Sequence, residues 1–239
     1  MTGAARRIEE VAESFWKRAG GRQKFGLPVD LDRAVALALP LGIVRMPALS
    51  TAKVAAVLQR IGTVPWSARR DRALRGCLVA DMGVGLVFLD GSDPADEQRY
   101  SLAHEAAHFL LHYIEPRGRV LETLGPGAKD VLDRRRPPTT AERLSAALAA
   151  VRLEPCRHAM ERGPGGAVDH FRTGDIENEA DDLAMEILVP LAELDLRHDL
   201  SVQGLSADYG IPPWAAGRLV SSKGSESDGV INIFGKRRF

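Results

Sequence analysis

The chain has 239 residues, a length that fits one large domain or one domain with appendages. Lys plus Arg and Asp plus Glu both total 32, so no overall charge would draw the chain to nucleic acid or an anionic membrane. Its only cysteines, Cys77 and Cys156, are too few for a disulfide framework. Because the N-terminal residues lack the apolar stretch of a signal peptide and no run approaches ~18 apolar residues, we expect a cytoplasmic protein and no membrane partner.

The N-terminal part is expected to be helical with one short strand. Apolar residues at helical spacing and residues of the types that cap helices predict helices over 5–19, 31–39 and 51–61, and a short apolar run predicts a strand over 43–46. Asp30 and Ser50 are the expected N-caps of the second and third helices. Residues 74–80 and 84–90, separated by a turn at Asp81-Met82-Gly83, predict a β-hairpin. Both strands carry apolar residues on both faces, which favours a sheet covered by helices.

A long helix is expected after the hairpin. Asp93 is the predicted N-cap, with Pro94 at the first helical position. The apolar pattern continues to Tyr113, and we expect the helix to stop before Pro116. This helix is long, central and apolar on most sides, which is typical of a buried helix.

The remainder divides into four parts. We expect an insertion over 115–172 with at least one helix after a capping box at 139–142, a helix over about 176–188, two short helices within 199–222, and a flexible tail over 223–239. Residues 1–198, including the insertion, are predicted to form the main domain. The second short helix of 199–222 offers only Arg218 to base edges, so we do not expect direct DNA binding.

His104-Glu105-Ala106-Ala107-His108 is an H-E-x-x-H motif within the predicted central helix. Residues i and i+4 lie on one helix face, so both imidazoles can reach one Zn²⁺ at about 2.1 Å. Glu105 then stands beside the metal, where a carboxylate can take a proton from water that the metal has made more acidic. The alternative, an accidental motif on an exposed helix, fits poorly because the neighbouring residues are apolar.

A catalytic zinc needs a third protein ligand. His112 lies two turns from His104, too far along a straight helix to join the same ion, so we assign it to packing or to support of a ligand. Ile114 stands where a metzincin has its third histidine, which excludes that subclass. The acidic helix over 176–188 offers Glu177 and Glu179, and periodicity does not choose between them. Cys156 and His158 form a lone C-x-H pair, which we interpret as incidental.

Two segments resemble the ImmA/IrrE family of metallopeptidases. The helix RYSLAHEAAHFLLH (99–112) is similar to the family's active helix, and EADDLAMEILVP (179–190) is similar to its second motif. The resemblance covers about residues 8–113 and 176–220. It implies an α+β, zincin-like metallopeptidase domain, mostly helical, with a small β-sheet packed on the active-site helix. Ala107 departs from the glycine often found there, and the link of roughly 70 residues between the motifs is longer than is common in the family.

Carried over position by position, the resemblance implies His104, His108 and Glu179 as zinc ligands, Glu105 as the catalytic glutamate and Asp181 as a residue that orients a ligand. Glu177 lies outside the matched motif, so the resemblance does not imply that it is a zinc ligand. The function that the resemblance implies is zinc-dependent cleavage of a specific protein, commonly a transcriptional repressor of helix-turn-helix type or another regulator of stress response. The competing hypothesis is a non-catalytic, zinc-holding module that grips a regulatory partner.

Overall fold

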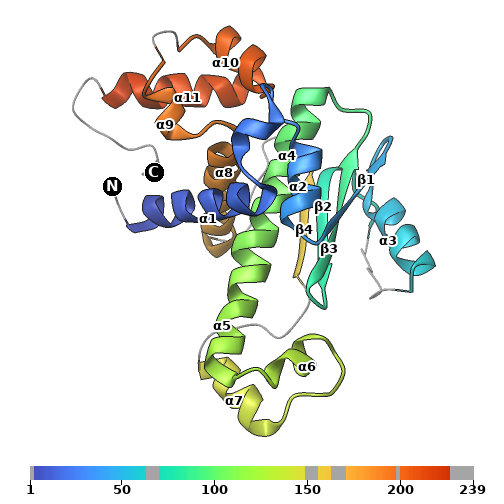
Figure 1. Cartoon of the computed structure of the whole chain (residues 1–239). Helices are drawn as coiled ribbons and strands as arrows, with labels where there is room; N and C mark the ends of the chain where they lie inside the picture. Colours follow the sequence, from blue (N-terminus) through green and yellow to red (C-terminus); the bar gives the residue numbers. More distant parts are fainter. Residues whose placement is uncertain (1–2, 63–69, 149–155, 163–170, 198–199, 227–239) are drawn as a thin grey trace.

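The computed structural model describes residues 3–62, 70–148, 156–162, 171–197 and 200–226. It is an α+β structure, mostly helical, built around one small sheet (Figure 1). The predicted fold class is confirmed at this level.

The sheet has four strands in the order β1-β3-β2-β4. The strands are β1 (Leu41–Met46), β2 (Leu74–Asp81), β3 (Val84–Asp90) and β4 (Cys156–Glu161). β1 runs parallel to β3, whereas β2 is antiparallel to both β3 and β4. The predicted hairpin is therefore confirmed as β2 and β3, and β4 lies at one end of the strand order, next to β2.

Helices cover both faces of the sheet, as the apolar strands predict. The N-terminal helices are α1 (Gly3–Ala19), α2 (Leu31–Ala38) and α3 (Thr51–Arg60), with a 3-10 turn, η1 (Arg22–Phe25), between the first two. The Asp30 and Ser50 side chains accept hydrogen bonds from backbone N–H groups in the first turns of α2 and α3, so both predicted caps are confirmed. α3 packs Val54 and Leu58 against one face of the sheet.

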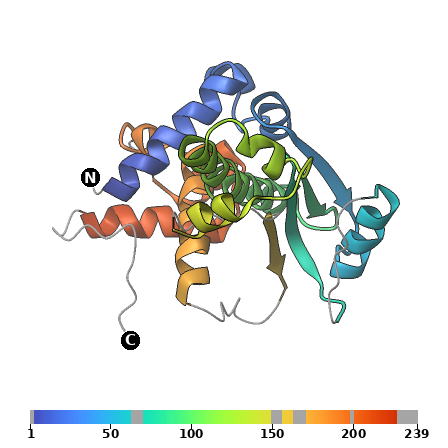
Figure 2. The ribbon, with the colours of Figure 1, turned by 90° about the horizontal axis from the view of Figure 1, so that it is seen from below.

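The other face of the sheet holds the central helix α4 (Ala95–His108), which lies between the sheet and α8 (Phe171–Leu188) (Figure 2). Its N-cap is Pro94 and not Asp93, whose carboxylate instead accepts a hydrogen bond from Arg162. The prediction that the helix stops before Pro116 is wrong. A π-helical turn, η2 (Phe109–Ile114), leads directly into α5 (Glu115–Leu124), and the backbone stays helical at Ile114 and Glu115, with Pro116 in the first turn of α5.

The segment expected as one insertion, 115–172, serves two different parts of the fold. α5, α6 (Ala128–Leu132) and α7 (Thr140–Leu148) form a helical extension away from the sheet, with a small core of Val120, Ala128 and Leu132 (Figure 1). β4, in contrast, joins the central sheet beside β2. The missed strand matters because it carries a side chain into the candidate site described below.

The C-terminal part consists of α9 (Leu191–Leu194), α10 (Val202–Tyr209) and α11 (Pro213–Glu226). Ala215, Ala216 and Leu219 of α11 are buried in the main core, in line with a packing role for these helices. The predicted tail began at residue 223, whereas α11 continues to Glu226, and 227–239 lie outside the described residues. Among the described residues, no helix is long and apolar enough to cross a membrane.

Candidate metal centre

α4 brings His104 and His108 together at its buried centre. Every residue from Tyr100 to His108 is buried, because α4 has the sheet on one side and α8 on the other. The spacing of four residues stacks the two imidazoles one turn apart, with their Nε2 atoms 3.0 Å from each other. The H-E-x-x-H residues therefore lie on one helix, as predicted. The Nε2 atoms of both rings point toward the same place.

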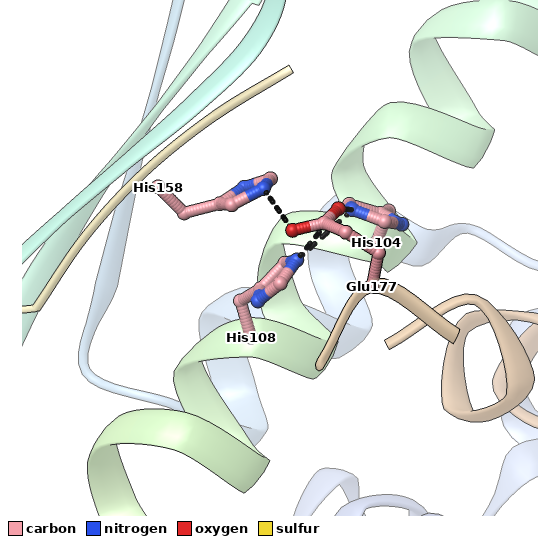
Figure 3. A group of neighbouring side chains, drawn as sticks. All are labelled: His104, His108, His158 and Glu177. Carbon is pink, nitrogen blue, oxygen red and sulfur yellow. Dashed lines mark hydrogen bonds and ion pairs between the residues drawn. The ribbon is translucent and has the colours of Figure 1, made fainter. Parts of the chain in front are cut away.

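α8 contributes the third member of the cluster through Glu177. Its Oε2 atom lies 3.3 Å from Nε2 of His104 and 3.5 Å from Nε2 of His108. Figure 3 shows this carboxylate directed between the two rings. A histidine pair from one helix and a carboxylate from a distant helix thus meet at one place.

Glu179, which the resemblance nominated as a ligand, lies elsewhere. Its carboxylate contacts the guanidinium of Arg7 at 3.4 Å and Nε2 of His112 at 3.6 Å. The physical reason is the helix itself: two residues along α8 correspond to a rotation of about 200°, so the two glutamates leave on different faces. The structure places Glu177 beside the histidines in the position that the motif comparison gave to Glu179.

His158 of β4 joins the same cluster, which the sequence reasoning missed. One ligand atom from each of His104, His108, His158 and Glu177 lies within 4.8 Å of the others (Figure 3). Side chains alternate along a strand, and Cys156 and Met160 pack on the core that contains α4, whereas Ala159 packs on the opposite core. The alternation of Cys156, His158 and Met160 was the available signal, but the charged Arg157 and Glu161 masked the strand.

Glu105 is completely buried between α4 and the sheet. Gly76 of β2 makes room for it: a Cβ there would lie 3.1 Å from Oε1 and 3.3 Å from Cγ of Glu105. Oε2 accepts a hydrogen bond from Nδ1 of His158 at 2.9 Å, whereas Oε1 has no hydrogen-bond partner among the described residues. A buried carboxylate oxygen without a partner is costly, so this atom is available to a ligand or water.

Supporting residues hold the outer nitrogens of both ligand histidines. Nδ1 of His104 lies 2.9 Å from Oδ1 of Asp181, which also accepts from the Tyr100 hydroxyl. Arg218 of α11 donates to the other oxygen of Asp181 at 3.2 Å. Nδ1 of His108 lies 2.9 Å from Nδ1 of His112, so His112 supports a ligand instead of reaching the cluster itself. Such contacts fix the orientation of a metal-binding imidazole.

The charges around the cluster favour ionised carboxylates and affect the two ligand histidines differently: burial lowers the pKa of His104, but its contacts with Asp181 and Glu177 outweigh this and raise it. Burial, together with the nearby His158 and His104, lowers the pKa of His108 to about 4, which keeps this ring in the neutral form that binds metals. Burial raises the pKa of Glu177, but hydrogen bonds from His104, His108 and His158 outweigh it, so the pKa is strongly lowered. For His158, burial opposes the charged form, yet Glu105 and Glu177 raise its pKa to about 10. The two carboxylates therefore favour the protonated form of His158.

The donor set fits a tetrahedrally coordinated ion. Ligands about 2.1 Å from a zinc ion are roughly 3.4 Å from one another at the corners of a tetrahedron. The three distances between Nε2 of His104, Nε2 of His108 and Oε2 of Glu177 are 3.0, 3.3 and 3.5 Å. Two imidazoles and one carboxylate can thus bind one divalent ion without rearrangement of the backbone.

Comparison with known proteins adds no independent identification. No protein-family model matches the chain, and no curated protein matches its sequence significantly. The resemblance to ImmA/IrrE peptidases therefore rests on the two motifs, and the metal centre rests on the geometry described above.

Proposed function

We propose that the protein is a metal-dependent hydrolase that cleaves a peptide bond, with the metal held by His104, His108 and Glu177. One observation carries the proposal: three donor atoms from two helices converge with tetrahedral spacing, and the buried Glu105 is joined to the same cluster by the contact of its Oε2 with His158. His₂Glu sets are typical of catalytic zinc, since three protein ligands leave one position open. We therefore propose zinc as the metal.

Each residue has a separate task in this account. Zinc, when bound, would polarise a carbonyl and make water more acidic. Glu105 takes the proton from the attacking water and passes it to the leaving amine. Gly76 preserves the space in which this carboxylate can move, and Asp181 keeps His104 oriented with Nε2 toward the ion.

The finer features of the function come from the motif resemblance. A zincin-like arrangement is supported by the central helix with two ligands packed on a small sheet. A specific protein substrate, such as a helix-turn-helix repressor in a stress-response circuit, and a cytoplasmic location remain our predictions. Neither the net charge of zero nor the buried face of α11 favours direct DNA binding.

The alternative function is a metal-holding module without catalysis, and His158 is the observation that favours it. Four protein ligands close a tetrahedral site and leave no position for water or substrate. His158 belongs to the cluster of possible ligands. Both of its nitrogens, however, already contact carboxylates, at 2.9 Å and 3.0 Å, which favours the open site and the hydrolase.

The test is Glu105→Gln, which keeps the shape of the side chain but removes the base. Zinc-loaded wild-type protein, incubated with a library of peptides, should produce new peptide termini detectable by mass spectrometry. Glu105→Gln should bind as much zinc as the wild type and cleave at least about 100-fold more slowly. Glu179→Gln is the matched control, since it changes a glutamate outside the cluster and should cleave normally. Equal cleavage by Glu105→Gln and the wild type would contradict the mechanism.

A further inference from the structure

His158 links the two carboxylates of the candidate centre. Its Nδ1 atom lies 2.9 Å from Oε2 of Glu105, and its Nε2 atom lies 3.0 Å from Oε1 of Glu177. These carboxylates come from α4 and α8, whereas His158 comes from β4. One side chain from the sheet therefore joins groups on two helices.

The hydrogen-bond chemistry decides what such a link can be. Each ring nitrogen of His158 faces a carboxylate oxygen within hydrogen-bond distance, so both nitrogens are already engaged by Glu105 and Glu177. In this arrangement His158 differs from His104 and His108, whose Nε2 atoms lie 3.0 Å apart and both face Oε2 of Glu177.

In each of the two carboxylates, one oxygen contacts His158 and the other does not. In Glu177, Oε1 contacts His158 while Oε2 faces the two histidines at 3.3 and 3.5 Å. In Glu105, Oε2 contacts His158 while Oε1 has no partner among the described residues. In Glu177 one oxygen is fixed and the other is directed to the centre, whereas in Glu105 His158 fixes Oε2 and Oε1 lies next to Gly76 of β2.

Packing fixes the ring of His158 itself. It stacks on the ring of His108, with 3.6 Å between centroids and 20° between planes. β4 is held antiparallel to β2, with His158 opposite Leu78. The ring therefore has little freedom to turn away, and its side chain is only 14% exposed.

We propose that His158 is a positioning residue that holds the base Glu105 and the metal ligand Glu177 in register through two hydrogen bonds, and that it does not bind the metal. This inference rests on the proposed metal site and adds to it a third element of the fold, β4. It also gives the strand a function: β4 sets the distance between the catalytic carboxylate and the third ligand.

X-ray absorption of the zinc-loaded wild type measures the number of imidazoles on the ion. The inference predicts two, from His104 and His108. Three imidazoles, falling to two in His158→Phe, would make His158 a ligand and overturn the inference.

Zinc affinity, measured by competition with a chelator, gives the second readout. His158→Phe keeps an aromatic ring next to His108 but removes both donors, and should weaken zinc binding by about 10–100-fold, the usual effect of losing a supporting contact. His158→Gln retains one donor and should recover part of that loss. Met160→Leu, on the same face of β4, is the matched control and should bind zinc as the wild type does. Unchanged affinity in His158→Phe would overturn the inference.

His104→Ala separates this inference from the proposed function. It should lose zinc binding altogether. If His104→Ala bound zinc like the wild type, the metal centre itself would be wrong, whatever the His158 variants do. If His104→Ala lost zinc and His158→Phe did not, only the role of His158 would fall.

Discussion

Two sides of helix α8 carry chemically similar glutamates with different surroundings. Glu177 faces the centre of the molecule, where its carboxylate contacts His104, His108 and His158 and its side chain is 24% exposed. Glu179, two residues later, is 43% exposed and contacts Arg7 and His112. One side of α8 contributes to the candidate metal centre, whereas the other forms a partly exposed ion pair with α1.

The comparison shows that a sequence motif can identify a helix without identifying which of its side chains binds the metal. The pattern E-A-D in 179–181 locates the helix, but only the rotation of the helix decides which acid points to the histidines. Asp181 lies four residues after Glu177, one turn along the same face, and it contacts Nδ1 of His104. The ligand and its neighbour Asp181 therefore share a face that excludes Glu179.

The largest expected effect is the loss of zinc affinity when Glu177, and not Glu179, is replaced. Glu177→Ala removes a ligand and leaves His104 and His108 alone, so zinc affinity should fall by more than about 100-fold, beyond the loss seen when a supporting contact is removed. Glu179→Ala should change it less than about threefold, because an exposed ion pair is worth little. Chelator competition on both variants measures the difference. Equal losses, or a larger loss in Glu179→Ala, would contradict the assignment.

Asp181→Asn tests the contact between Asp181 and His104 on the side of α8 that carries Glu177. It keeps the shape but weakens the contact with Nδ1 of His104, so zinc affinity should fall by about 10–100-fold. Asp182→Asn is the neighbouring control and should change zinc affinity little. Because the Tyr100 and Arg218 contacts also end at Asp181, circular dichroism should accompany the titration to show that the fold is intact. An affinity equal to that of the wild type would remove Asp181 from the support of the centre.

Gly76→Ala tests the base without touching a ligand. The added Cβ would meet Glu105 at 3.1 Å and displace its carboxylate by a few tenths of an ångström. We expect peptide cleavage to fall by about tenfold, since small displacements of a catalytic group are costly, while zinc affinity stays within about twofold. A loss of affinity equal to the loss of cleavage would mean that Gly76 shapes the ligand cluster and not the base.

The smallest expected effect concerns another acid of α8, Glu186. Burial raises the pKa of Glu186 to about 7 from its ordinary 4.5, and it has no histidine cluster to stabilise its charge. The folded protein therefore binds this proton more tightly than the unfolded chain does, and stability is lost as pH rises from about 4.5 through 7. Glu186→Gln should raise Tm at pH 8 by about 2–4 °C, roughly 1 kcal/mol after allowance for partial exposure, and leave it nearly unchanged at pH 4.5. An equal shift at both pH values would contradict this explanation.

Much of the fold was predictable because its signals are local. The caps Asp30 and Ser50, the turn between β2 and β3 and the apolar spacing of α1 each depend on a few neighbouring residues. The continuation past Pro116 was not predictable by the same logic, because a π-helical turn carries the helix on from α4 into α5, which has the proline in its first turn. β4 was missed because its pairing partner, β2, lies about 80 residues earlier and gives no local signal.

The candidate site divides in the same way. His104, Glu105 and His108 lie on one helix, so their relation follows from helical spacing alone. Glu177 and His158 reach the centre through tertiary packing, which sets the rotation of α8 and the partner of β4. Sequence spacing left Glu177 and Glu179 as alternatives, and the choice depended on how α8 packs on α4.

The most direct test of the central claim is a crystal structure of the zinc-loaded protein with anomalous diffraction at the zinc edge. The account predicts one ion about 2.1 Å from Nε2 of His104 and Nε2 of His108 and within a similar distance of the Glu177 carboxylate, with Glu179 turned toward Arg7. An ion bound by Glu179, or one bound away from the two histidines, would contradict it.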